Sequence, residues 1–117
     1  MKTILIVEDT EINIDLLTQL LEDEYHLLIA RDGVQALTLA DQGHPDLILM
    51  DISLPGMDGY AATRAILARH ASLPILGLSA HAMAGDADKA SAAGCSDYLT
   101  KPLDEILLFQ KIKAYIG

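Results

Sequence analysis

Acidic, hydroxyl and ammonium side chains stand at the ends of short apolar runs in this sequence. These residues are Glu8, Asp9, Asp51, Ser79 and Lys101. Carboxylates bind hard cations such as Mg²⁺, and a hydroxyl or a lysine can hold the oxygens of a phosphoryl group. Whether these side chains act together depends on the elements that would bring their apolar runs side by side.

The run that ends at Asp51 is the best defined of these elements. Leu47–Met50 is too short for a helix and does not alternate with polar residues, which is typical of a strand buried on both faces in a parallel sheet. Pro55 and Gly56 then break regular structure, and Asp58 is expected to cap the next helix. Open α/β sheets carry their chemistry at the carboxyl ends of central strands, although an Asp there can also simply begin a loop.

The other apolar patterns predict that strands and helices alternate along the chain. Strands are expected at residues 3–7, 25–30, 47–51, 75–78 and 97–99. Helices are expected at about 11–23, 34–40, 59–69, 83–93 and 104–116. This order indicates one α/β domain over residues 1–117, with a doubly wound five-stranded parallel sheet, right-handed crossovers and helices on both faces.

The first helix is expected to be amphipathic. Its apolar residues recur at helical spacing and are Ile12, Leu16 and Leu20, with Leu17 and Leu21 beside them. The helix at 83–93 is rich in alanine, so its buried face is thin and we expect it to be the least well anchored.

The last helix carries more apolar residues than one face can hold. Its expected core face consists of Leu108, Ile112, Tyr115 and Ile116. Ile106 and Leu107 then point elsewhere, and they are a candidate surface for a partner protein. Exposed apolar residues can also be neutral, so the alternative is that these two side chains bind nothing.

The first and third strands are expected to be central, with carboxyl ends that flank the point where strand order reverses. Glu8 and Asp9 would then lie beside Asp51. Unit charges about 4 Å apart repel by roughly 4 kcal/mol at an effective dielectric near 20, so a cation is needed, and Mg²⁺ suits oxygen ligands. Lys101, held by Pro102 behind it, can add positive charge, although a lysine there is usually only solvated. Ser79 is either a hydrogen-bond donor to a phosphoryl oxygen or a plain turn cap.

Composition limits the possible partners and the location. With 17 acidic and 8 basic residues the formal net charge is −9, which argues against direct binding of nucleic acid. The apolar runs are too short to cross a bilayer, and Met1–Thr3 leads straight into a strand without a secretory signal. The single Cys95 fits a reducing compartment, so a cytoplasmic location is expected.

Four motifs together resemble the receiver domain of bacterial two-component response regulators, and the resemblance covers essentially the whole chain. They are Ile4–Asp9, Leu49–Gly59, Leu78–Ala80 and Tyr98–Pro102. The resemblance implies a flavodoxin-like receiver fold with strand order 2-1-3-4-5. The loop 80–86 is closest to the chemotaxis-receiver-like, single-domain type and to receivers inside hybrid kinases, rather than to receivers fused to DNA-binding domains.

The family's site residues transfer to matching positions of this chain. Asp51 would accept a phosphoryl group from a phosphohistidine on a sensor histidine kinase or a histidine phosphotransfer protein. Glu8, Asp9, Asp51 and the backbone carbonyl of Ser53 would hold Mg²⁺, and Lys101 would pair with phosphoryl oxygens. Ser79 and Tyr98 would switch the surface that a downstream target protein reads, and the Lys101–Pro102 bond would be cis.

Two other function classes share parts of this pattern. A Mg²⁺-dependent phosphohydrolase of the haloacid dehalogenase type also uses an Asp nucleophile, but it needs a second acid two residues later, where this chain has Ser53. A flavodoxin-like cofactor carrier shares the strand order, but Glu8–Asp9 would repel the cofactor's phosphate in the absence of metal. The receiver assignment predicts no enzyme with an external substrate, only self-phosphorylation and self-dephosphorylation at Asp51.

Overall fold

The computed structural model describes residues 1–52, 59–79 and 86–117, with the backbone alone described at 86, 87 and 90. Five parallel strands form one sheet in the order β2-β1-β3-β4-β5, as predicted. The strands are β1 (Thr3–Val7), β2 (His26–Ala30), β3 (Leu47–Asp51), β4 (Ile75–Ser79) and β5 (Asp97–Thr100). The helices are α1 (Glu11–Leu21), α2 (Gly33–Gly43), α3 (Gly59–Arg69), α4 (Asp86–Ala93) and α5 (Glu105–Ile116).

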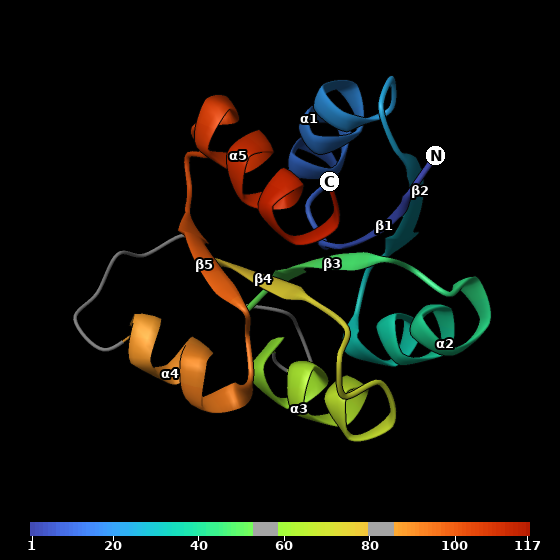
Figure 1. Ribbon diagram of the computed structural model, residues 1–117, viewed down its shortest axis with the longest axis vertical. Helices are drawn as coiled ribbons and strands as arrows, with labels where there is room; N and C mark the ends of the chain where they lie inside the picture. The colour runs from blue at the N-terminus through green and yellow to red at the C-terminus, as the bar shows by residue number, and fades with distance from the viewer. Residues whose placement is uncertain (53–58, 80–85) are drawn as a thin grey trace.

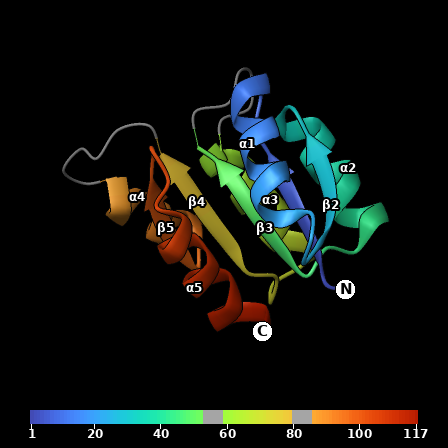
Figure 2. The same cartoon turned by 90° about the horizontal axis from the view of Figure 1, so that it is seen from above.

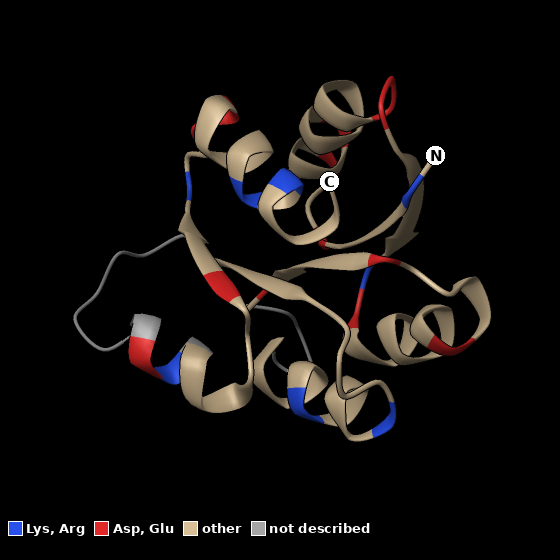
Figure 3. Ribbon diagram, viewed as in Figure 1, with Lys and Arg blue, Asp and Glu red and all other residues tan. Residues whose placement is uncertain are grey.

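Most element boundaries agree with the sequence prediction to within a residue or two. Helix α1 ends at Leu21 rather than at residue 23, and the following acids Glu22–Glu24 form an exposed turn. Figure 3 shows this turn as a red loop that projects beside the N-terminus. The predicted start of the fourth helix at Met83 and the predicted cap Asp58 both lie outside the described residues.

Helices cover both faces of the sheet. Helices α1 and α5 lie on one face, whereas α2, α3 and α4 lie on the other (Figure 1). Alternation along β3 serves both layers: Leu47 and Leu49 pack in the cluster under α1 and α5, and Ile48 and Met50 pack in the cluster over α2 and α3. This explains why the run is apolar throughout, because both sides of the strand are buried.

Helix α1 shows that the predicted apolar face was partly wrong. Its buried residues are Ile14, Leu17 and Leu21. Ile12 is 78% exposed and Leu16 is 44% exposed, although both belong to the apolar row that defined the helix in the sequence. Because the helix carries apolar residues on more than one face and the sheet contacts a single face, one row is left in solvent.

Helix α5 follows the prediction except at one residue. Leu108 and Ile112 are fully buried, whereas Ile106 is 72% exposed and Leu107 is 40% exposed, as expected. Tyr115 was placed on the core face but is 39% exposed. Its phenolic hydroxyl donates to the backbone carbonyl of Ser96 at 2.8 Å, and this polar contact keeps the end of the ring at the surface.

The helices are all short. Within the described ranges, none has both the length and the apolar character needed to span a bilayer.

Candidate functional site

The sheet register brings the ends of four strands together. The last paired residues of β1 and β3 are Val7 and Met50, so Glu8 and Asp51 follow side by side. Ser79 pairs with Thr100 at the end of β4 and β5, and Lys101 follows directly. The Lys101 backbone N–H donates to the Ser79 carbonyl at 2.7 Å. All strands run in the same direction, so these residues lie together at the carboxyl-terminal end of the sheet, called the sheet edge below (Figure 2).

Side-chain alternation then selects the face on which each group lies. Glu8, Asp51 and Lys101 are each two residues beyond a member of the cluster under α1 and α5, namely Ile6, Leu49 and Leu99. Their three side chains therefore share that face of the sheet edge. Ser79 falls in phase with Ile75, which packs in the opposite cluster.

The three acids form one cluster, as the sequence predicted. Glu8, Asp9 and Asp51 each offer a carboxylate oxygen, and these oxygens lie within 4.8 Å of one another. Glu8 is fully buried and Asp51 is 5% exposed, whereas Asp9 is exposed. The donor set therefore combines hard oxygen ligands with an open side, which fits Mg²⁺ together with water.

Lys101 supplies the positive charge that this cluster needs. Its ammonium lies 2.7 Å from Oε2 of Glu8 and 3.7 Å from Oδ2 of Asp51. The Lys101 side chain is only 17% exposed, so this ion pair is mostly shielded from water. The sequence predicted that Lys101 would lie near the acids, but it did not predict that Glu8 would be the closer partner.

Electrostatics at Glu8 follow from these contacts. Burial alone would raise the pKa of Glu8, but the hydrogen bond and charge of Lys101, helped by the backbone N–H of Thr10, hold the pKa below its ordinary value. The Thr10 N–H donates to Oε1 at 3.3 Å. Glu8 is therefore ionised and has a partner on each carboxylate oxygen.

Gly59 is a site residue that sequence reasoning missed. A methyl group added there would overlap the Cα of Ile52 and the carbonyl oxygen of Asp51, so only glycine lets α3 begin against the end of β3. The Gly59 N–H donates to the Ile52 carbonyl at 3.3 Å. The available signal was a glycine at the first position of a predicted helix, where its low helix propensity calls for a packing reason.

The predicted switch residues lie on adjacent strands. Ser79 is 3% exposed at the end of β4, and Tyr98 is partly buried on β5. Tyr98 pairs with Gly77 of β4. Gly77 has no side chain, and its position lies on the same side of the sheet as Ser79. The Lys101–Pro102 peptide is cis, as the family resemblance implied. Ser53, the predicted carbonyl ligand, lies outside the described residues.

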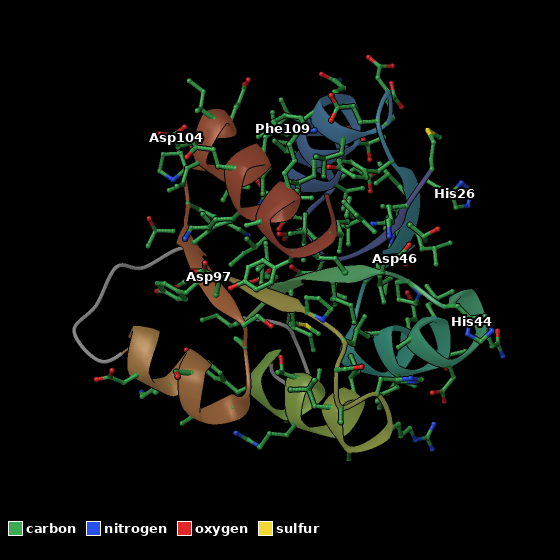
Figure 4. All side chains as sticks on the ribbon, in the orientation of Figure 1. His26, His44, Asp46, Asp97, Asp104 and Phe109 are labelled. Carbon is green, nitrogen blue, oxygen red and sulfur yellow. The ribbon has the colours of Figure 1, made fainter. Side chains whose placement is uncertain are left out.

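The edge strand that leads to Lys101 is fastened to α5. Lys111 forms an ion pair with Asp97 at 2.9 Å, and Asp97 lies on β5 beneath α5 (Figure 4). The Asp97 carboxylate also accepts the backbone N–H of Tyr98 at 2.8 Å. Burial alone would raise the pKa of Asp97, but these contacts outweigh it and lower that pKa. The strand that carries Tyr98 and leads to Lys101 is therefore held in place by charge as well as by sheet pairing.

Comparisons with known proteins agree with this geometry. Residues 4–113 match the family described as the response regulator receiver domain. The polar-differentiation response regulator DivK of Brucella ovis is 39% identical over 121 residues, a match that covers 99% of this chain and 97% of the relative.

Solved structures give the same result. The receiver domain of the sensor histidine kinase PA1611 from Pseudomonas aeruginosa PAO1 is 38% identical with a TM-score of 0.91, covers 99% of this chain and 98% of its own, and has a magnesium ion coordinated in its active site cleft. The chemotaxis protein CheY4 of Vibrio cholerae is 25% identical with a TM-score of 0.92, covering 98% of each chain.

These findings favour the receiver over the phosphohydrolase and the cofactor carrier. The relatives include both a DivK regulator of nearly the same length and a receiver domain of a sensor kinase, the two types to which the loop at 80–86 pointed. The family match spans residues 4–113, and the solved structures share the fold over nearly the whole chain. The chain belongs to the response regulator receiver domain family and is a phosphorylation-activated switch of two-component signalling.

Proposed function

We propose that Asp51 accepts the phosphoryl group, from a phosphohistidine, in a reaction that requires Mg²⁺. The observation that carries this proposal is the convergence of Glu8, Asp9 and Asp51 at one sheet edge with the ammonium of Lys101 beside them. Asp51 is the member of the set that ends β3, the middle strand of the sheet, and the Lys101 ammonium lies 3.7 Å from its Oδ2. An isolated surface aspartate has none of these neighbours.

Glu8, Asp9 and Asp51 would hold the metal, with the backbone carbonyl of Ser53 as a further ligand. When bound, Mg²⁺ would neutralise the acids and the charge that spreads over the phosphoryl oxygens. The magnesium in the cleft of the PA1611 receiver domain supports the choice of ion, because that domain is 38% identical to this chain. The open side left by the exposed Asp9 gives the ion and its water a route to the cluster.

The transfer uses an oxygen of Asp51 as the nucleophile. This oxygen forms the new bond to phosphorus, the phosphorus–nitrogen bond of the phosphohistidine breaks, and the imidazole leaves and takes up a proton. Hydrolysis of the resulting acyl phosphate returns the carboxylate and inorganic phosphate. We propose that the chain turns over no external substrate beyond this self-modification.

Two donors would hold the phosphoryl oxygens from opposite sides of the sheet edge. Lys101 lies on the face under α5, and its ammonium is 3.7 Å from Asp51. Ser79 is in phase with the other face. Drawing the Ser79 hydroxyl toward the phosphoryl group would open space beside Gly77, and the ring of Tyr98, which pairs with that glycine, could then turn inward.

The partner surface is proposed on α5. Ile106 and Leu107 expose apolar area in the first turn of α5, the helix that follows β5 in the chain, and we propose that movement of Tyr98 on β5 is transmitted to this surface. Receiver domains act between histidine kinases and downstream targets, and we propose a histidine kinase or phosphotransfer protein as donor and a protein as target, without direct nucleic acid contact or membrane insertion. A cytoplasmic location is also proposed, because the single Cys95 has no second cysteine in the sequence to pair with and fits a reducing compartment.

Intact-mass spectrometry after incubation with acetyl phosphate tests the proposal. Wild-type protein with Mg²⁺ should gain one phosphoryl group, whereas Asp51→Asn and wild-type protein in excess chelator should gain none. Asp46→Asn is a matched control, because Asp46 precedes the same strand at its other end. Labelling of Asp51→Asn at the wild-type level would refute the assignment of the acceptor.

A further inference from the structure

Arg31 is a second basic residue at the sheet edge that carries the acid cluster. It directly follows β2, as Lys101 directly follows β5. The backbone N–H of Glu8 donates to the carbonyl of Ala30 at 2.9 Å, so Arg31 leaves its strand next to the first acid of the cluster. Arg31 is also two residues beyond Ile29, which packs against the apolar cluster under α1 and α5. Its side chain therefore begins on the same face of the sheet as those of Glu8 and Lys101.

Glu11 holds the Arg31 side chain at the rim of the acid cluster. The guanidinium lies 2.7 Å from Oε2 of Glu11, which is the first residue of α1. The backbone N–H of Arg31 donates to the side-chain oxygen of Gln35 at 2.8 Å, which fixes the base of the arginine. The Arg31 side chain is 49% exposed and that of Glu11 is 64% exposed. An ion pair in this much water is weak, so another anion can take the place of Glu11.

A phosphodonor that approaches Asp51 is an anion and meets an acidic protein. The formal net charge is −9, and three carboxylates form the cluster that includes Asp51. Lys101 is hydrogen-bonded to Glu8, and its side chain is only 17% exposed. Arg31 is therefore the more accessible of the two cations that follow strands at this edge. Its guanidinium also offers paired donors that match two oxygens of a phosphoryl group.

Arg31 is close enough to act on a donor at the acceptor. Strands β2 and β3 flank β1, and Val7 pairs with both Ala30 and Met50. Arg31 and Asp51 therefore follow at the same level, two strand spacings or about 10 Å apart between their Cα atoms. The Debye length is about 8 to 10 Å at ordinary salt concentrations, so the attraction reaches the acceptor and strengthens as salt is removed.

We propose that Arg31 binds the phosphoryl group of an incoming phosphodonor, and that Glu11 holds the guanidinium ready at the rim. This inference rests on the proposed role of Asp51 as the acceptor. The phosphoryl oxygens replace the Glu11 carboxylate at the guanidinium, which concentrates the donor beside Asp51 before transfer. The bonds that form and break during transfer are unchanged, and Arg31 raises the rate at which the donor is captured.

The initial rate of labelling by acetyl phosphate tests this role at low donor concentration, by intact mass. Saturating MgCl₂ is used so that a changed affinity for Mg²⁺ does not affect the rate. A unit charge about 10 Å from a dianion in water changes the local donor concentration about fourfold. Arg31→Met should therefore be labelled about fourfold more slowly than wild type at low ionic strength, whereas Arg31→Lys keeps the charge and should retain most of the rate.

Arg64→Met is the matched control. It removes another exposed arginine and changes the net charge in the same way, from −9 to −10, but Arg64 lies on α3, against the opposite face of the sheet (Figure 1). Its labelling rate should stay close to that of wild type.

Three further readouts separate an electrostatic role from a structural one. The deficit of Arg31→Met should shrink to about twofold with phosphoramidate, which is a monoanion. The deficit should almost vanish in about 1 M NaCl, where the Debye length is about 3 Å. Glu11→Gln frees the guanidinium and removes an acid from the rim, so it should be labelled faster than wild type. This variant keeps Arg31 and provides a test even if Arg31→Met folds poorly.

The outcomes distinguish this inference from the assignment of the acceptor. If wild type is not labelled, or if Asp51→Asn is labelled equally, the acceptor is wrong. If wild type is labelled at Asp51 while Arg31→Met keeps the wild-type rate at low ionic strength, or shows the same deficit in high salt, the acceptor stands and the role of Arg31 is refuted. A Glu11→Gln rate at or below that of wild type would refute the restraint by Glu11.

Discussion

Replacing Asp9 by Asn should stabilise the metal-free protein and weaken its response to Mg²⁺. Asp9 faces two other carboxylates, Glu8 and Asp51, with oxygens within 4.8 Å. At 4.8 Å a pair of unit charges repels by about 3.5 kcal/mol at an effective dielectric near 20. Lys101 offsets part of this repulsion, and the exposure of Asp9 screens most of the remainder.

These opposing effects leave an expected gain of about 1 kcal/mol in the free energy of unfolding, or a rise of about 4 °C in Tm. Saturating Mg²⁺ should reverse the order. A bound ion stabilises wild type by linkage, about 2.7 kcal/mol at a hundredfold excess over Kd, whereas Asp9→Asn has lost a ligand and gains less.

Differential scanning calorimetry in excess chelator and in saturating MgCl₂ measures both effects. Asp15→Asn is the control: it changes the net charge from −9 to −8 in the same way, but Asp15 is an exposed acid on α1 outside the cluster. Its Tm should change little in either buffer. A lower Tm for metal-free Asp9→Asn than for wild type would show that these acids do not repel one another, and the electrostatic account of the site would be wrong.

Two further predictions concern the elements around the acceptor. Ser79→Ala should still bind beryllofluoride at Asp51, but the changes in amide NMR shift over residues 86–106 should be smaller than in wild type. A complete reversal of the equilibrium between inactive and active conformations needs about 5.5 kcal/mol, and one lost hydrogen bond removes about 1 kcal/mol of it. Shift changes as large as in wild type would mean that the signal takes another route. Gly59→Ala should lower the free energy of unfolding by about 1 to 3 kcal/mol in urea titrations, and it should slow labelling by acetyl phosphate. The reason is that the added methyl group pushes α3 away from the Asp51 carbonyl. Unchanged stability would show that α3 can relax without disturbing β3.

The backbone of the site was predictable because local patterns determine it. The unalternating run Leu47–Met50 and its end at Asp51 define a buried parallel strand, and the register of β1 against β3 then places Glu8 beside that end. The sheet order and the approach of Lys101 follow from the same topology. None of this depends on fine side-chain packing.

The misjudged details depend on tertiary contacts that a sequence pattern does not encode. Ile12 and Ile14 are equally apolar, but only Ile14 faces the sheet. Tyr115 continues the apolar arc of α5, yet its hydroxyl finds the Ser96 carbonyl and stays at the surface. The choice of Glu8 over Asp51 by the flexible Lys101 side chain is likewise a matter of local distances, 2.7 Å against 3.7 Å.

A crystal structure of the complex with Mg²⁺ and beryllofluoride tests the central claim most directly. We expect the beryllium to be bonded to a carboxylate oxygen of Asp51, the metal to contact the acid cluster, and the Lys101 ammonium to contact a fluorine atom. Beryllofluoride at any other carboxylate, or an Asp51 that contacts neither the ion nor the phosphoryl mimic, would contradict the assignment of Asp51 as the phosphoryl acceptor.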